Sequence, residues 1–183
     1  ALHSSHPLPE HIDVHGYWLS GESKMSKSLG NVVRPQTFDR HFGIANLRYF
    51  FLREMKFGQD SSFTYELFIE RYNADLSNGL GNLLSRVSSI VKKNLDSKLP
   101  CKPDLFGPQE SEIVKQAQNT IETYPKLIED RSFHKAVELI RNLLASTDKY
   151  INDTAPWRLA KQEGSEEELK KVLYVGLETT RIA

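Results

Sequence analysis

Residues 24–28 read Lys-Met-Ser-Lys-Ser and are followed by Leu-Gly-Asn, a run whose chemistry suits the handling of phosphate. Its two lysines carry compact positive charges on flexible stems, and Ser26 and Ser28 add hydroxyl donors. Gly21 and Gly30 flank the run, and glycine lets a backbone approach a ligand closely. A solvated loop without chemistry would explain Lys-x-x-Lys alone but explains the full string poorly. We therefore predict a mobile, cationic, phosphate-binding loop.

A second set of polar side chains has the spacing of one helical face. Asn78, Asn82 and Arg86 follow one another at steps of four residues, so they form a row on a helix. Asparagine offers a donor and an acceptor to a base edge, and arginine offers a planar fork. Trp157 follows Pro156, where an exposed indole would be able to stack on an unpaired base. Spacing alone favours the plainer interpretation, a solvated polar face and a core tryptophan.

Composition limits the classes of protein to which the chain can belong. Basic and acidic side chains both total 24, so any RNA contact must depend on a few placed residues rather than on a broad basic field. No apolar run approaches the roughly 20 residues of a membrane helix, and no signal peptide opens the chain. The single Cys101 allows no intrachain disulfide, and the histidines at 3, 6, 11 and 15 fit no zinc spacing, so we expect no metal site. We expect a cytoplasmic protein, with an organelle matrix as the alternative.

The groups that could do chemistry must be positioned mainly by helices. Residues 11–19 alternate apolar and polar side chains and predict a strand. Its partners are hard to find downstream, so we expect them to lie elsewhere and the chain to begin inside a larger protein. Residues 36–42 predict a short helix and residues 44–55 a largely buried one. The stretch from Gly58 to Ser62 predicts a loop.

Longer helices follow. Thr64 is a plausible N-cap for a helix that runs to about residue 95, and two more helices are expected at 110–129 and 132–152. A short helical segment opens at Pro156, and a last helix follows a capping box at 165–168. Four antiparallel helices with short connections suggest an α-helix bundle, so the predicted class is mainly α. The apolar stripe of the first long helix is Leu76, Leu80, Leu83, Leu84, Val87, Ile90 and Val91.

The string at 24–28 resembles the KMSKS signature of class I aminoacyl-tRNA synthetases. The resemblance implies amino-acid activation, in which a carboxylate joins the α-phosphate of MgATP and pyrophosphate leaves. Lys24 and Lys27 would neutralise the charge that builds on the leaving phosphates, with Lys27 the stronger candidate for the transition-state contact. Ser26 and Ser28 match the hydroxyl positions of that loop, and Met25 is expected to be an apolar anchor.

The rest of the chain extends the resemblance to the methionyl-tRNA synthetases. The match covers nearly the whole chain and is weakest at 96–131. In that family the segment after the signature loop contacts the tRNA stem, and the following helix bundle binds the CAU anticodon of tRNA(Met). The resemblance thus implies that Asn82 and Arg86 contact anticodon bases and that Trp157 is a stacking platform, with Asn78 and Pro156 as weaker candidates. It is carried by Leu47-Arg48-Tyr49-Phe50, Phe57-Gly58-Gln59-Asp60, Arg71-Tyr72-Asn73-Ala74-Asp75-Leu76, the row at 78, 82 and 86, and Ala155-Pro156-Trp157.

The same resemblance divides the chain into three parts. Residues 1–19 would be the end of a Rossmann catalytic domain, residues 20–63 the signature loop and stem-contact fold, and residues 64–183 the anticodon-binding bundle. Members of the family make methionyl-adenylate from methionine and ATP and then charge tRNA(Met). The His-x-Gly-His motif of class I enzymes is absent here, so we expect this chain alone to be inactive. The methionine pocket and a zinc-binding insertion would lie in the missing upstream region.

Two alternatives stay open. Another class I synthetase, for cysteine, isoleucine, valine or leucine, is disfavoured by the set Asn82, Arg86 and Trp157. A non-catalytic tRNA-binding module derived from a synthetase is disfavoured by the intact lysines of the loop. Ala45 and Asn46 stand where many relatives have an aspartate, which puts one helix cap in doubt. The sequence does not give the oligomeric state.

Overall fold

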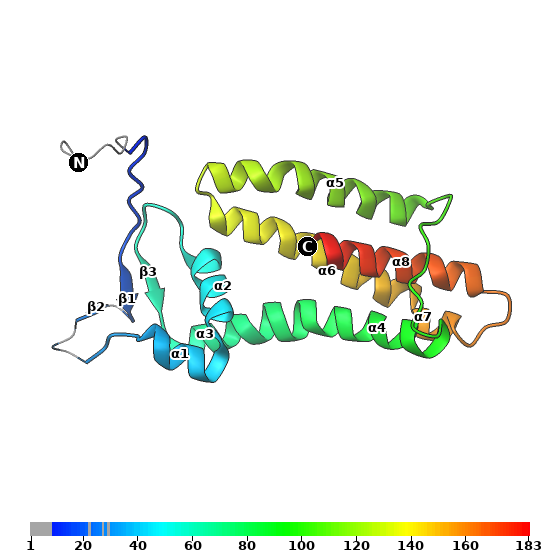
Figure 1. Ribbon diagram of the computed structural model, residues 1–183, viewed down its shortest axis with the longest axis horizontal. Helices are drawn as coiled ribbons and strands as arrows, with labels where there is room; N and C mark the ends of the chain where they lie inside the picture. Colours follow the sequence, from blue (N-terminus) through cyan, green and yellow to red (C-terminus); the bar gives the residue numbers. More distant parts are fainter. Residues whose placement is uncertain (1–8, 22, 27, 29) are drawn as a thin grey trace.

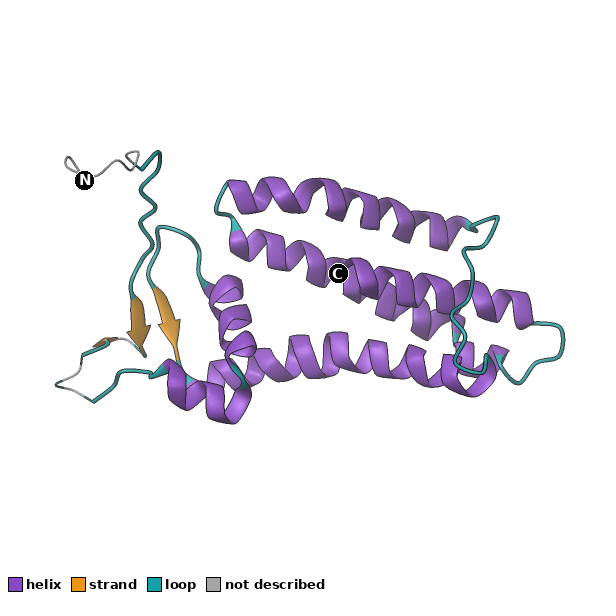
Figure 2. Cartoon of the chain, in the orientation of Figure 1, coloured by secondary structure: helices purple, strands orange, loops and turns teal. Residues whose placement is uncertain are grey.

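A small sheet with short helices occupies one end of the molecule, and long helices form a bundle that fills the rest (Figure 1 and Figure 2). The computed structural model describes residues 9–21, 23–26, 28 and 30–183. All seven elements that it describes after the last strand are helical, so the predicted mainly α class is confirmed. None of the described helices is long and apolar enough to cross a membrane.

The sheet has three short strands in the order β2-β1-β3. Strand β1 (Trp18–Ser20) pairs antiparallel with β2 (Ser23–Lys24) and parallel with β3 (Ser61–Phe63). The prediction of a strand over 11–19 was therefore too long, and the expectation that its partners lie elsewhere was wrong. Strand β3 was assigned to a loop because three residues, two of them serines, carry no readable alternation.

An aromatic cluster joins this sheet to the first helices, α1 (Pro35–Phe42) and α2 (Ile44–Glu54). Phe38 packs edge-on against both Phe63 of the sheet and Phe68 of the next helix, and all three are almost fully buried. The N-terminal cap of α2, which Ala45 and Asn46 left in doubt, is supplied by a residue of α1. The carboxylate of Asp39 accepts a hydrogen bond from the Ile44 N–H at 2.9 Å. The cluster thereby joins Met25, the sheet and α2 into one unit.

One long helical rod follows, as predicted, but its middle is wider than an α-helix. It consists of α3 (Tyr65–Arg71), the π-helical η1 (Tyr72–Gly81) and α4 (Asn82–Asn94). Thr64 is the N-cap, and its hydroxyl accepts a hydrogen bond from the Leu67 N–H at 3.1 Å. A Cβ at Gly81 would lie 2.9 Å from the Leu76 carbonyl oxygen, so glycine permits this close turn.

The burial along α4 also corrects the predicted core stripe. Leu84 comes one residue after Leu83 in this regular helix, so it stands at the edge of the face that Leu83, Val87 and Val91 bury. Leu83 and Val87 are fully buried as predicted, but Leu84 is 44% exposed. The core face of the rod is therefore narrower than the leucine spacing indicated.

The bundle is completed by α5 (Pro108–Glu129), α6 (Phe133–Thr154), the short α7 (Pro156–Leu159) and α8 (Glu166–Ile182). Helices α4, α6 and α8 share the buried core around Leu83, Ile151 and Leu173. The predicted capping box before α8 does not form, because the Ser165 hydroxyl donates to the carbonyls of Leu159 and Gln162 instead. Helix α7 begins at Pro156, which fits the first helical turn.

Candidate functional site

The predicted phosphate-binding loop begins at β2 and leaves the sheet at Lys24, whose side chain is exposed. Asn31 closes the base of the loop: its side-chain oxygen accepts from the Ser26 N–H at 2.7 Å, and its side-chain nitrogen donates to the Lys24 carbonyl at 3.3 Å. The hydroxyls of Ser26 and Ser28 lie 2.8 Å apart. Sequence reasoning missed Asn31, although an asparagine that bonds nearby backbone is a common turn signal.

Two further residues of the loop, Met25 and Lys27, were also predicted to contribute to it. Met25 is half-buried and packs against the aromatic cluster, which is the anchoring role expected of it. Lys27 lies outside the described residues. Of the two loop lysines, the structure therefore describes Lys24. Among the described residues no carboxylate forms an ion pair with it.

The residues of the predicted polar row have two different surroundings. Asn78 lies in η1 and Asn82 is the first residue of α4, and both are exposed at an open hollow of about 570 Å³ that Asn46 of α2 also lines. Arg86, one turn further along, faces α6 and is not part of that hollow. The three residues are thus neighbours along one rod, but Arg86 is bound by α6 whereas Asn78 and Asn82 stay exposed.

Arg86 is held in place by two side chains of α6. Its guanidinium donates to Asp148 Oδ1 at 2.8 Å and to Asn152 Oδ1 at 2.6 Å, and the Asn152 amide donates to the other oxygen of Asp148 at 2.9 Å. Arginine can donate in this way through two coplanar nitrogens, whereas lysine cannot. Sequence reasoning missed Asp148 and Asn152. They follow Arg86 by 62 and 66 residues, so no local pattern connects them with it.

Trp157 stands against the same guanidinium. The Arg86 guanidinium carbon lies 5.2 Å from the centre of the indole ring, and 40% of the Trp157 surface is exposed. Pro156 is buried and begins α7 after Ala155, whose left-handed backbone (φ 45°) ends α6 and turns the chain. The structure thus brings Arg86, Pro156 and Trp157 together and leaves an aromatic surface open to a ligand.

A buried carboxylate joins the two ends of the molecule. Asp75 of η1 accepts from the Tyr49 hydroxyl at 2.9 Å, from Arg53 on α2 and from Arg141 on α6 at 2.9 Å. Burial and the adjacent Asp75 carboxylate raise the pKa of Tyr49 well above its usual value. Because α2 belongs to the loop end and α6 to the bundle, this network fixes the loop-bearing part relative to Arg86 and Trp157.

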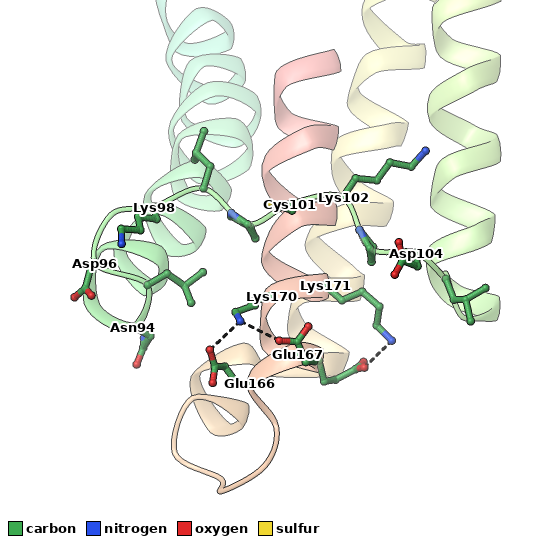
Figure 3. Close-up of a pocket in the computed structure, with 16 residues that line it drawn as sticks. Asn94, Asp96, Lys98, Cys101, Lys102, Asp104, Glu166, Glu167, Lys170 and Lys171 are labelled. Atoms are coloured by element: carbon green, nitrogen blue, oxygen red, sulfur yellow. Dashed lines mark hydrogen bonds and ion pairs between the residues drawn. The ribbon is translucent and has the colours of Figure 1, made fainter.

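A wide hollow of about 650 Å³ lies between the loop after α4 and the first turns of α8 (Figure 3). Lys170 pairs with Glu166 at 2.8 Å and with Glu167 at 2.9 Å, and Lys171 pairs with Glu168 at 2.6 Å. These charges are matched within one helix, so they stabilise the start of α8 rather than present an unopposed charge. In the described part of the chain no three His, Cys, Asp or Glu side chains gather as they would around a metal ion.

Comparison with known families assigns the two ends of the chain separately. Residues 1–88 match the family described as tRNA synthetases class I (M), and residues 101–180 match the anticodon binding domain of methionyl tRNA ligase. The first match contains the loop and η1, and the second contains Pro156 and Trp157.

Individual relatives agree. The chain is 41% identical to a methionine–tRNA ligase of Bacillus subtilis, over 97% of this chain and 27% of that protein. It is 42% identical to a methionine–tRNA ligase of Enterococcus faecalis, over 96% of this chain and 26% of that protein. The solved structure of Mycobacterium tuberculosis methionyl-tRNA synthetase in complex with methionyl-adenylate superimposes with a TM-score of 0.90 at 36% identity, over 96% of this chain and 35% of that one. The chain therefore spans about a quarter to a third of these relatives.

Proposed function

Because the chain belongs to the methionyl-tRNA synthetase family, we propose that it is a portion of a methionine–tRNA ligase. The parent protein would convert methionine and MgATP to methionyl-adenylate and then charge tRNA(Met), with Mg²⁺ entering with ATP. The observation that carries this proposal is the presence, on one chain, of the complete signature loop and of an exposed tryptophan beside a fixed arginine. The first feature suits phosphate and the second suits an unpaired base.

In the proposed activation step, Lys24 and Lys27 bind the departing pyrophosphate. The charge on the leaving phosphates grows toward the transition state, so cations placed there in advance lower the barrier. Ser26, Ser28 and the Met25 backbone form the remainder of this ATP-binding loop. Loss of one such contact costs about 10² to 10³ in rate, as for other groups that stabilise developing charge.

In the proposed recognition step, the bundle binds the CAU anticodon. Trp157 stacks on one base, Arg86 and Asn82 contact base edges, and Asn78 and Pro156 complete the surface. The charge balance of the chain fits this proposal, because recognition through a few placed groups needs no broad basic field.

The proposed division of labour follows the three parts of the sequence. Residues 1–19 close the catalytic domain, residues 20–63 carry the ATP loop and the contact to the tRNA stem, and residues 64–183 read the anticodon. The pocket for methionine and any zinc would belong to parts of the family's proteins that this chain does not contain. We place the parent in the cytoplasm or an organelle matrix, where its tRNA is charged.

The experiment that tests this function uses the full-length enzyme and two assays. Binding to anticodon stem–loops should favour CAU over single-base variants, and a lack of preference would point to another class I synthetase. Lys27→Ala should slow ATP–pyrophosphate exchange far more than it weakens methionine binding. An equal loss in both would contradict the transition-state role, and a full-length protein without exchange activity would favour a non-catalytic tRNA-binding module.

A further inference from the structure

The ammonium of Lys24 lies over the ring of Tyr17, 4.5 Å from the ring centre. Lys24 ends β2 and Tyr17 directly precedes β1: Lys24 pairs with Leu19, and Tyr17 lies two residues before Leu19. Diagonal neighbours of this kind lie on the same face of a sheet and are within reach of long side chains. The contact is therefore built into the register of β1 and β2.

Tyr17 is itself held firmly by the strand on its other side. Its N–H donates to Asp60 Oδ1 at 2.7 Å, and its carbonyl accepts from the Ser61 N–H at 2.9 Å. The preceding Gly16 lies so close to Gln59 that a Cβ there would be 2.0 Å from the Gln59 carbonyl oxygen. Only glycine fits this approach, so the backbone that carries the ring is fixed against the start of β3.

The turn of the hairpin is tied to the same strand. The Ser62 hydroxyl donates to the Gly21 carbonyl at 2.8 Å, and Gly21 has a positive φ of 64°. The backbone of Lys24 is thus held by β1, while the rest of the signature loop extends beyond it. Lys24 is the fixed end of the loop, and only its long side chain is left to be oriented.

A tyrosine ring is suited to orienting that side chain. The negative face of the ring attracts an ammonium without donating to it or neutralising it, so the N–H groups that point away from the ring stay available for phosphate oxygens. A carboxylate in the same place would compete with phosphate for the lysine. The ring also limits the rotamers of a side chain that would otherwise lose much freedom on binding. Tyr17 keeps 65% of its surface exposed, so a ligand can approach the pair.

We propose that Tyr17 is a positioning residue for Lys24, holding its ammonium over the ring so that it meets the leaving phosphates of ATP without reorganisation. The proposal rests on the phosphate role of Lys24 in the proposed function. The pair forms one preorganised unit at the fixed end of the loop, and the hydroxyl of Tyr17 takes no part in it. The ring, not the phenol, carries the effect.

The test measures ATP–pyrophosphate exchange by the full-length enzyme with Tyr17→Leu, Tyr17→Phe, Lys24→Ala and the double variant Tyr17→Leu/Lys24→Ala. Tyr17→Leu should lower kcat about three- to tenfold while the KM values for ATP and methionine change less, because a group displaced by a fraction of an ångström loses rate before binding. Tyr17→Phe should restore the wild-type kcat. Tyr17→Leu should have no further effect in the Lys24→Ala background, since the two side chains act as a unit.

Each contrary result has a distinct meaning. If Lys24→Ala is slow but Tyr17→Leu is as fast as wild type, the positioning role is wrong and the proposed function stands. If Tyr17→Leu lowers kcat equally with and without Lys24, or raises only the KM for ATP, the ring acts on something other than this lysine, and the proposal is overturned. If Lys24→Ala is itself as fast as wild type, the phosphate role of Lys24 falls and the proposal falls with it. Tyr124→Leu, which removes a partly exposed tyrosine on α5, is the matched control and should leave exchange unchanged.

Discussion

The guanidinium carbon of Arg86 on α4 lies 5.2 Å from the ring centre of Trp157 on α7. Two hydrogen bonds to α6 fix the arginine, and Pro156 and the left-handed Ala155 fix the start of the helix that carries the tryptophan. Three helices thus place a planar cation beside an exposed aromatic surface. Because the guanidinium lies over the ring and both of its terminal nitrogens donate to α6, a base that stacked on Trp157 would meet the exposed part of an indole that a fixed cation already holds in place.

Removing the indole should weaken RNA binding without disturbing the fold. Trp157→Ala should lower the affinity of the full-length enzyme for a CAU anticodon stem–loop by about 1–3 kcal/mol, the usual contribution of one stacked base. Trp157→Phe, which keeps an aromatic face, should recover most of that loss. Titration of labelled stem–loops measures both. Equal affinity for the wild type and the alanine variant, with unchanged circular dichroism, would remove Trp157 from the site.

Replacing Arg86 by lysine separates charge from geometry. Lysine keeps the positive charge but cannot donate to Asp148 and Asn152 through two coplanar nitrogens. Arg86→Lys should therefore reduce the preference for CAU over single-base variants by about 1–3 kcal/mol, while the dependence of binding on salt stays the same. A variant that kept the full preference, or that lost affinity equally for all stem–loops, would show a phosphate contact instead of a base contact.

Features decided by local sequence were predictable. The Thr64 cap, the bounds of the bundle helices to within a few residues and the proline start of α7 follow from short-range rules for caps and breakers. The loop string also follows from residues that are adjacent in the chain, whereas spacing alone favoured a core tryptophan at 157, which the structure shows to be 40% exposed. These signals need no knowledge of which helix packs on which.

Features that depend on distant partners were not predictable. The pairing of β1 with β3 joins segments about 40 residues apart, and three residues of strand are too few to show a period. The π-helical turns depend on how η1 packs on α2 and α6, as in the hydrogen bonds of Asp75 with Tyr49 and Arg141. Asp75 is a charged residue within an apolar helical stretch, which weakly indicates a buried carboxylate. Its three partners come from α2 and α6, so no local pattern identifies them.

Asn31 should matter for the loop and not for RNA. Asn31→Ala removes the acceptor for the Ser26 N–H and the donor to the Lys24 carbonyl, so the loop loses its closed base. We expect ATP–pyrophosphate exchange to slow about tenfold, because catalytic groups that are poorly held lose rate steeply. Binding of the anticodon stem–loop should be unchanged. Asn31→Asp keeps the acceptor alone and should be intermediate, and an alanine variant as fast as wild type would contradict the role.

Asp75 should be among the most costly carboxylates to remove. Asp75→Ala would leave Arg53 and Arg141 without their shared partner at the joint between α2 and α6. Breaking a buried pair by removing one member costs about 3–5 kcal/mol, and the partial exposure of Arg141 places the expected loss in the free energy of unfolding near the lower end, about 3 kcal/mol. Asp148→Ala, which removes a carboxylate that is 42% exposed, should cost less than about 1 kcal/mol. Urea denaturation compares the two, and equal losses would show that Asp75 does not hold the joint.

The bundle should lose stability in alkali through Tyr150. This buried tyrosine donates to Glu110 Oε1 at 2.7 Å, and burial, followed by the Glu110 carboxylate, raises the pKa of its hydroxyl well above the usual value. The folded state therefore holds the phenolic proton more tightly than the unfolded chain does. This contribution is fully present below about pH 10, the unfolded pKa, and decreases by about 1.4 kcal/mol per pH unit above it.

Tyr150→Phe should be less stable near neutral pH by about 1–3 kcal/mol, because Glu110 loses its partner, yet its stability should fall less steeply above about pH 10. Urea denaturation of both proteins between about pH 8 and about pH 11 measures the difference. Parallel alkaline decreases in the two proteins would mean that Tyr150 does not link proton release to unfolding.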